Sequence, residues 1–102
     1  AYTTSKFAVI GLMKNAALEF AQQGVRVNSI HPAPVDNRMM RSLEAGYSPD
    51  DPSAFQDSLK AQIPLGRYAH NEDVARAVVY LASDQSAYLT GVQLPVDGGL
   101  TA

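Results

Sequence analysis

Residues 24–32 read Gly-Val-Arg-Val-Asn-Ser-Ile-His-Pro, and this stretch decides the fold class. A glycine commonly ends a helix because it adopts the left-handed conformation at no steric cost, so Gly24 marks the end of the element before it. Residues 25–31 are few and rich in β-branched side chains, and Pro32 stops them, which predicts a strand. Their imperfect alternation is typical of a strand covered on both faces, as in a parallel sheet.

Helical patterns lie on both sides of this strand. Residues 2–23 carry an apolar stripe at three- and four-residue spacing, which consists of Val9, Ile10, Met13, Ala17, Phe20 and Ala21. Residues 71–83 predict a further helix with Asn71 as its N-cap, and residues 92–96 a second strand. The order is that of an alternating α/β chain. Two strands alone make no stable parallel sheet, so we expect further strands upstream of Ala1.

The section between these elements, residues 32–66, holds five of the six prolines. Two weak helical patterns survive there, the first formed by Met39, Met40 and Leu43 and the second by Phe55, Leu59 and Ile63. Asp50 or Asp51 is expected to cap the second. Short helices that are joined by proline turns and expose Met and Leu are typical of a mobile lid.

Composition narrows the function classes. With 46% hydrophobic and 18% charged residues, the 102-residue chain is expected to bury a core. A net charge of −2 argues against a nucleic-acid or membrane-surface partner, and no apolar run approaches the roughly 18 residues of a membrane span. The chain has no cysteine and no histidine spacing for a metal, so we expect no metal site and a cytoplasmic location.

Tyr2 and Lys6 are the first candidates for chemistry. Four residues separate them at the start of the predicted first helix, so both lie on one face. A phenol titrates near 10, and a neighbouring ammonium group lowers such a pKa because it favours the phenolate. A tyrosine tuned in this way gives a proton to a carbonyl oxygen or takes one from an alcohol. The spacing alone equally fits two surface residues without a joint role.

Other motifs follow Tyr2-Thr-Thr-Ser-Lys6 in order: Gly24-Val-Arg-Val-Asn28, Pro64-Leu-Gly-Arg67, Glu72-Asp-Val-Ala75, Thr90-Gly91 and Val96-Asp-Gly-Gly99. Together, from residue 2 to residue 99, they resemble the C-terminal half of the short-chain dehydrogenase/reductase family. The resemblance implies that residues 1–102 are the C-terminal part of a Rossmann-like, doubly wound parallel sheet. The resemblance further implies that the N-terminal nucleotide-binding half, with the family's glycine-rich loop, catalytic Ser and active-site Asn, is expected upstream of Tyr2 and is absent from this chain.

The resemblance also implies roles for individual residues. Tyr2 matches the family's acid/base tyrosine, and Lys6 matches the lysine that lowers the pKa of that tyrosine and hydrogen-bonds the nicotinamide ribose. The loop that lies against the nicotinamide of NAD or NADP corresponds to residues 32–37. The implied cofactor contacts are Tyr2, Lys6 and, in this loop, Pro32, Ala33, Val35 and Asn37. Val35 would present its backbone to the carboxamide.

Two positions of this loop depart from the family pattern. Ala33 replaces a glycine, which restricts a turn that can require unusual backbone angles. Asn37 replaces the usual Thr and would approach the amide or the pyrophosphate, but it reads equally well as a helix cap.

Residues 37–65 correspond to the family's substrate-binding lid. The candidate substrate contacts are Pro34, Met39, Met40 and Leu43, and ordinary helix packing is the alternative for the three lid residues. The methionines of the lid favour a small or medium, moderately apolar carbonyl compound over a phosphosugar.

The function implied is an NAD(P)-dependent oxidoreductase that interconverts a carbonyl and an alcohol by hydride transfer. Tyr2 would act as general acid/base, assisted by Lys6, in a homotetramer; the 102 residues alone are expected to be inactive. One alternative is a non-catalytic binding or assembly subunit, which the departures at Ala33 and Asn37 would support. Another is a sugar-nucleotide epimerase or dehydratase, against which the short lid argues.

Overall fold

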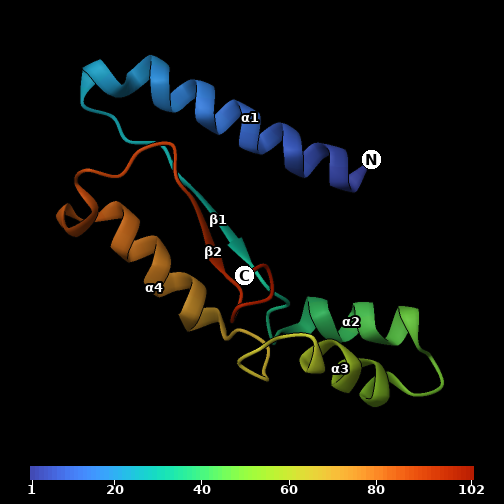
Figure 1. Cartoon of the computed structure of the whole chain (residues 1–102). Coiled ribbons are helices and arrows are strands. Elements are labelled where there is room, and N and C mark those ends of the chain that lie inside the picture. The colour runs from blue at the N-terminus through green and yellow to red at the C-terminus, as the bar shows by residue number, and fades with distance from the viewer. The chain divides into compact units, whose positions relative to one another are not determined.

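A computed structural model describes every residue from Ala1 to Ala102 (Figure 1). The elements, in chain order, are helix α1 (Tyr2–Phe20), 3₁₀ helix η1 (Ala21–Gln23), strand β1 (Ser29–Pro32), helices α2 (Arg38–Tyr47), α3 (Pro52–Ala61) and α4 (Asn71–Ala82), 3₁₀ helix η2 (Asp84–Ser86) and strand β2 (Gln93–Val96). None of the helices combines the length and the apolar character that a bilayer crossing requires.

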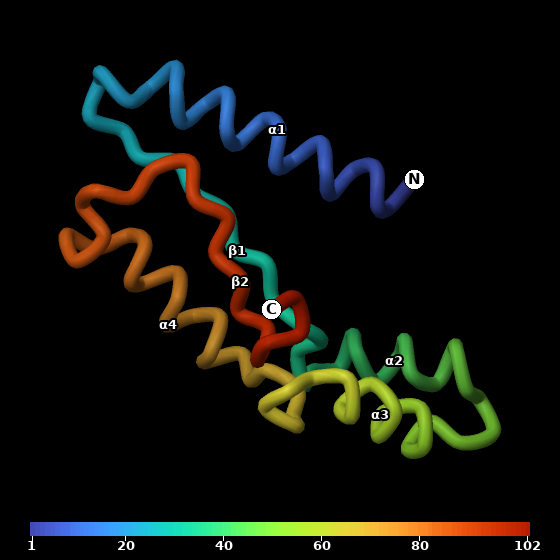
Figure 2. The backbone as a smooth tube through the Cα atoms, in the orientation of Figure 1, coloured from blue at the N-terminus to red at the C-terminus, as the bar shows by residue number.

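The chain divides into two compact units. The first comprises Ala1–His31 and Val78–Leu94, and the second comprises Pro32–Ala77 and Pro95–Ala102. Strands β1 and β2 form a two-stranded sheet and lie side by side in the backbone trace (Figure 2).

Backbone hydrogen bonds give the direction of the two strands. In the first unit the Ser29 N–H donates to the Val92 carbonyl (2.9 Å), and in the second the Ala33 N–H donates to the Val96 carbonyl (3.1 Å). Partners advance together along both strands, so the strands are parallel. The structure is therefore of the α/β class, as the sequence predicts.

In the first unit, α1 passes into η1, and the chain leaves η1 through Gly24, which has a φ of 76°. The helix predicted over residues 2–23 thus appears as an α-helix whose last turn tightens to 3₁₀ geometry. The predicted apolar stripe is covered at only two positions, Met13 and Ala17, whereas Val9 is exposed.

The strand predicted over residues 25–31 is wrong at both ends, because β1 begins at Ser29 and includes Pro32. At Val27 and Asn28 the chain makes one backbone bond, from the Gly91 N–H to the Val27 carbonyl (2.7 Å), and otherwise relies on side chains. The Val27 N–H donates to Thr90 Oγ1 (3.1 Å), and Asn28 Nδ2 donates to the Leu89 carbonyl (3.0 Å). A segment bonded in this way has no regular ladder, although its residues favour a strand.

The Arg26 side chain makes several hydrogen bonds within the first unit. Its Nη1 donates to Ser86 Oγ (3.1 Å) and to the Leu89 carbonyl (3.2 Å). Its Nη2 donates to the carbonyls of Leu81 (2.8 Å) and Ser83 (3.2 Å). Ser86 is only 1% exposed. One planar guanidinium therefore satisfies four acceptors of the segment that follows α4.

In the second unit, α2 and α3 lie side by side (Figure 1). Asn37 caps α2, because its Oδ1 accepts from the Met40 N–H (3.0 Å). Of the two predicted caps for α3, Asp51 is the one used, and its Oδ1 accepts from the Ala54 N–H (3.0 Å). Both caps occupy a donor that the first turn of a helix leaves unpaired.

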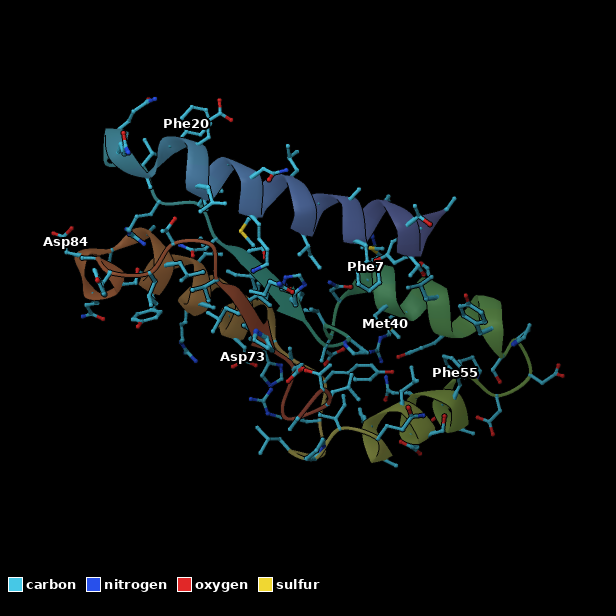
Figure 3. All side chains as sticks on the ribbon, turned by 45° about the horizontal axis from the view of Figure 1, so that its top comes forward. Phe7, Phe20, Met40, Phe55, Asp73 and Asp84 are labelled. Carbon is cyan, nitrogen blue, oxygen red and sulfur yellow. The ribbon has the colours of Figure 1, made fainter.

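The core of the second unit is small. Ala33, Ile63 and Tyr68 are buried, and the half-buried Met40 and Leu59 pack against them. Met40 extends from α2 and Phe55 from the neighbouring α3 (Figure 3). The core thus joins the lid helices to the end of β1 and to the segment before α4.

The predicted cap of α4 is wrong by one residue, since Asn71 is already helical. The acidic residue in the first turn supplies the cap instead. Asp73 Oδ2 accepts from the backbone N–H of His70 (2.8 Å), which is half of a capping box. The predicted helix over residues 71–83 ends at Ala82, and the strand predicted over 92–96 begins at Gln93.

A turn at Gly98 and Gly99 lies against the end of the lid region. Both glycines have positive φ, 60° and 92°. The Leu65 N–H donates to the Gly98 carbonyl (3.0 Å), and a Cβ atom at position 98 would lie 2.8 Å from Ile63 Cγ2. Only glycine fits this position without a shift of the buried isoleucine.

Candidate functional site

Tyr2 and Lys6 occupy the first turns of α1 in the first unit. Lys6 Nζ lies 5.1 Å from the centroid of the Tyr2 ring, over its face. The contact is a cation–π interaction. Tyr2 is 72% exposed, so its hydroxyl group is accessible to a reactant. The pair thus offers a phenol with a positive charge beside it.

The loop after β1, in the second unit, is held by a single parallel bridge between Val35 and Ala69. The Ala69 N–H donates to the Pro34 carbonyl (3.0 Å), and the Asp36 N–H donates to the Ala69 carbonyl (2.8 Å). In such a bridge the middle residue directs its own N–H and C=O away from its partner. Val35 therefore presents one donor and one acceptor on the opposite edge of the loop.

Ala33 sits in ordinary backbone geometry. No residue other than glycine has a positive φ, and the Ala33 side chain is part of the core. The expectation that alanine restricts the turn here is therefore wrong, because the turn does not need a left-handed residue. This removes one of the two departures that favoured a non-catalytic role.

Asn37 serves as a helix cap, which is one of its two predicted uses. Its Oδ1 is committed to the Met40 N–H, whereas its Nδ2 makes no hydrogen bond within the protein. The side chain is half-buried at the start of α2. An amide donor thus remains available beside the Val35 edge of the loop.

The predicted substrate contacts separate into two kinds. Met39 is 69% exposed on α2 and Leu43 is also exposed, so both are accessible to a ligand. Met40 packs against the core, which is the alternative predicted for it. Pro34 is half-buried, and its carbonyl accepts the bond from Ala69.

The predicted site residues thus form two groups. Tyr2 and Lys6 meet in the first unit, and the loop from Ala33 to Asn37 meets α2 in the second. Pro32 ends β1 and is exposed. His31, which the sequence left without a role, has Nε2 2.8 Å from Ser29 Oγ.

Sequence reasoning assigned no functional role to the residues that hold the loop in place, although a salt bridge or a cap within the fold was expected of Arg67. Ala69 bonds the loop directly, and Arg67 Nη1 bonds both the Tyr68 carbonyl (2.9 Å) and Asp73 Oδ2 (2.8 Å). The ion pair fixes the segment that carries Ala69 to the start of α4. Its only signal in the sequence was the motif Pro64-Leu-Gly-Arg67 a few residues before an acidic helix start.

The ion pair also shifts the titration of Asp73. The hydrogen bond from Arg67 and then the backbone N–H of His70 lower the pKa of Asp73 to about 2. The same contact raises the pKa of Arg67. Asp73 is therefore ionised throughout the physiological range.

Asp73→Asn is expected to weaken the acid dependence of stability between about pH 4 and pH 2. A carboxyl group with a lowered folded-state pKa stabilises the fold above its unfolded value near 3.9, and this contribution disappears as pH falls through the folded value. The urea-unfolding midpoints of wild type and Asp73→Asn should differ at pH 7 and converge towards pH 2. The exposed Asp50→Asn serves as the control, and a constant difference across this range would contradict the prediction.

Comparison with known proteins identifies families and structures to which this chain is similar. The model of a family described as enoyl-(acyl carrier protein) reductase matches residues 1–101. Oxidoreductase UcpA of Salmonella typhimurium is 45% identical over 101 residues, which are 99% of this chain and 38% of that protein. The chain thus spans well under half the length of this relative.

Two solved structures are similar over nearly all of the chain. A short-chain dehydrogenase family protein from Francisella tularensis has a TM-score of 0.92 at 35% identity, covering 98% of this chain and 43% of that one. A protein from Agrobacterium tumefaciens, solved with bound NADP, has a TM-score of 0.85 at 37% identity, covering 97% of this chain and 38% of that one. The α/β elements described above thus match part of a larger fold in each case.

Proposed function

Because this chain belongs to the short-chain dehydrogenase/reductase family, we propose that it supplies the proton-transfer pair and the nicotinamide-side loop of an NAD(P)-dependent oxidoreductase. The reaction would interconvert a carbonyl compound and an alcohol by hydride transfer. The observation that carries the proposal is the pairing of an accessible phenol with an ammonium group, Tyr2 with Lys6, 5.1 Å from ring centroid to Nζ.

The loop after β1 suits a carboxamide chemically. A carboxamide has an N–H donor and a C=O acceptor, and the unpaired C=O and N–H of Val35 complement both. Asn37 Nδ2 adds a donor for a further oxygen, such as one of a pyrophosphate. These residues would hold the nicotinamide side of NAD or NADP, which when bound gives or takes the hydride.

Tyr2 would carry the proton in this reaction. In the reductive direction its hydroxyl donates the proton to the substrate oxygen, and in the oxidative direction it removes the proton from the alcohol. Lys6 places a positive charge over the ring of the phenol, where it would favour the phenolate that forms when the proton leaves, and it would also hydrogen-bond the ribose. Met39 and Leu43, exposed on α2, would contact a moderately apolar substrate.

A spectrophotometric assay of the whole protein tests the proposal. The assay follows the loss of absorbance of the reduced nicotinamide. We expect oxidation of NADH or NADPH with at least one compound from a panel of aliphatic and aromatic aldehydes and ketones. Cofactor binding without turnover across the panel would favour a non-catalytic binding or assembly subunit. The departure at Asn37 is the one remaining observation for that alternative, because Ala33 no longer supports it.

We also propose that the whole protein is a homotetramer. Large apolar side chains stay exposed on α1 and on α4, among them Phe7, Leu12, Leu18, Val78 and Val79. Such surface favours burial, either within the same subunit or between copies, and the family resemblance supports contacts between copies through the helices that match residues 2–23 and 71–83. Light scattering at micromolar concentration should give four times the subunit mass, and a monomeric mass would contradict the proposal.

A further inference from the structure

Tyr68 is the most deeply buried large side chain of the second unit. It is 2% exposed, and it packs with Ala33 and Ile63 in the core. Two cations lie over its ring: Arg41 Cζ from α2 at 5.6 Å and Lys60 Nζ from α3 at 5.4 Å from the ring centroid. The ring is thus held by both lid helices.

The two cations are themselves held in place. Arg41 Nη2 lies 2.8 Å from Asp36 Oδ1 and 3.3 Å from Oε1 of the buried Glu44. Lys60 Nζ donates to Gln56 Oε1 (3.0 Å), and Gln56 Nε2 in turn lies 3.3 Å from Glu44 Oε1. A chain of polar contacts therefore links the two cations that lie over Tyr68, and through Arg41 and Asp36 it reaches the loop after β1.

The hydroxyl group of Tyr68 is buried near the Glu44 carboxylate. Its Oη is buried and has no hydrogen-bond partner. Burial first, and then the nearby Glu44 carboxylate, raise the pKa of Tyr68 to about 12, so the phenol stays neutral. A buried hydroxyl without a partner is costly, which indicates that the position needs the aromatic ring.

The ring acts on the loop through the next residue. Ala69 follows Tyr68 directly, and its backbone bonds Pro34 and Asp36 on either side of Val35. Movement of Tyr68 would displace Ala69, and the bridge would carry that displacement to the N–H and C=O of Val35.

We propose that Tyr68 is a positioning residue: its ring, in contact with Arg41 and Lys60, sets through Ala69 the orientation of the Val35 peptide groups that would receive the nicotinamide carboxamide. This inference rests on the proposed function. According to this inference, Tyr68 and Ala69, in the segment before α4, affect the affinity for the cofactor without contacting it.

The test compares Tyr68→Leu with Tyr68→Phe in the whole protein. Leucine removes the cation–π contacts, so the KM for the reduced cofactor should rise about tenfold while kcat at saturating cofactor stays within about twofold. Phenylalanine keeps the ring, so its KM should equal that of wild type and its urea-unfolding midpoint should be no lower. Tyr88→Leu is the control, because Tyr88 is fully exposed.

Lys60→Met provides a second variant that leaves the core intact, with an expected rise in KM of about threefold because one cation remains over the ring. A lowered unfolding midpoint with unchanged cofactor KM in Tyr68→Leu and Lys60→Met would overturn the inference and leave the proposed function standing. An equal KM increase in Tyr68→Phe would also overturn it. If wild type neither binds nor oxidises NADH or NADPH, the proposed function itself fails, and the inference with it.

Discussion

Tyr2→Phe is expected to lower kcat for carbonyl reduction by about 10²- to 10⁴-fold, the range that a positioned general acid contributes. Phenylalanine keeps the ring under Lys6 but has no proton to give. Because Tyr2 is largely exposed and its side chain makes no hydrogen bond, the variant should fold as wild type does. The loop of the second unit is unchanged, so the KM for the cofactor should stay within about twofold.

The matched control is Tyr88→Phe, which removes the same hydroxyl from a fully exposed ring elsewhere in the first unit and should leave kcat unchanged. Steady-state rates with saturating cofactor, together with the fluorescence change on binding of the reduced cofactor, separate chemistry from affinity. If Tyr2→Phe retains more than a tenth of the wild-type kcat, Tyr2 is not the proton donor.

Arg26→Met is expected to produce the largest loss of stability, about 3 kcal/mol in the free energy of unfolding. Methionine retains much of the aliphatic length but removes the four hydrogen bonds of the guanidinium, among them the bond to the hydroxyl of the buried Ser86. The carbonyls that lose this donor each keep another one, from Asn28 or from Ser86. A hydrogen bond to a charged group contributes about 1.5–3 kcal/mol, and four bonds from one guanidinium do not add fully.

Arg26→Lys should recover only part of this loss, because an ammonium group lacks the planar fork that reaches four acceptors. Urea denaturation followed by circular dichroism measures the difference. Arg76→Met is the control, since Arg76 is exposed and makes no ion pair or side-chain hydrogen bond. A loss below about 1 kcal/mol for Arg26→Met would show that water replaces the guanidinium at these acceptors.

Local signals in the sequence predicted those features that depend on one or two neighbouring residues. Gly24 takes the left-handed conformation that the predicted end of the first helix requires, and Asp51 caps α3. The α/β class followed from the order of the patterns. These features are set by backbone sterics and by side chains within one helical turn, so the local sequence contains their causes.

Features that depend on residues distant in the sequence could not be predicted from local patterns. Val25 and Val27 favour a strand, yet residues 89–91 bond Val27 and Asn28 in an irregular arrangement, so β1 starts later than predicted. The cap of α4 was misplaced because Asp73 reaches back to His70 while it also binds Arg67. Propensity does not register such competition between partners.

In the candidate site, too, local contacts were predictable and contacts between distant segments were not. Spacing alone placed Tyr2 and Lys6 on one helix face, and the two side chains are in contact. The bridge between Val35 and Ala69 joins segments far apart in the chain, and no periodicity signals it. The roles of individual residues came from the family resemblance, and the comparisons confirm the family while the roles remain proposals.

The turn at Gly98 restricts which residues positions 98 and 63 can carry together. Its positive φ and its 2.8 Å approach to Ile63 Cγ2 each exclude a side chain for a separate reason. A homologue with alanine at position 98 must therefore also shorten the residue at position 63, and even then it retains the backbone penalty. We therefore expect glycine at position 98 in homologues that have isoleucine at position 63, and few homologues in which both residues have changed.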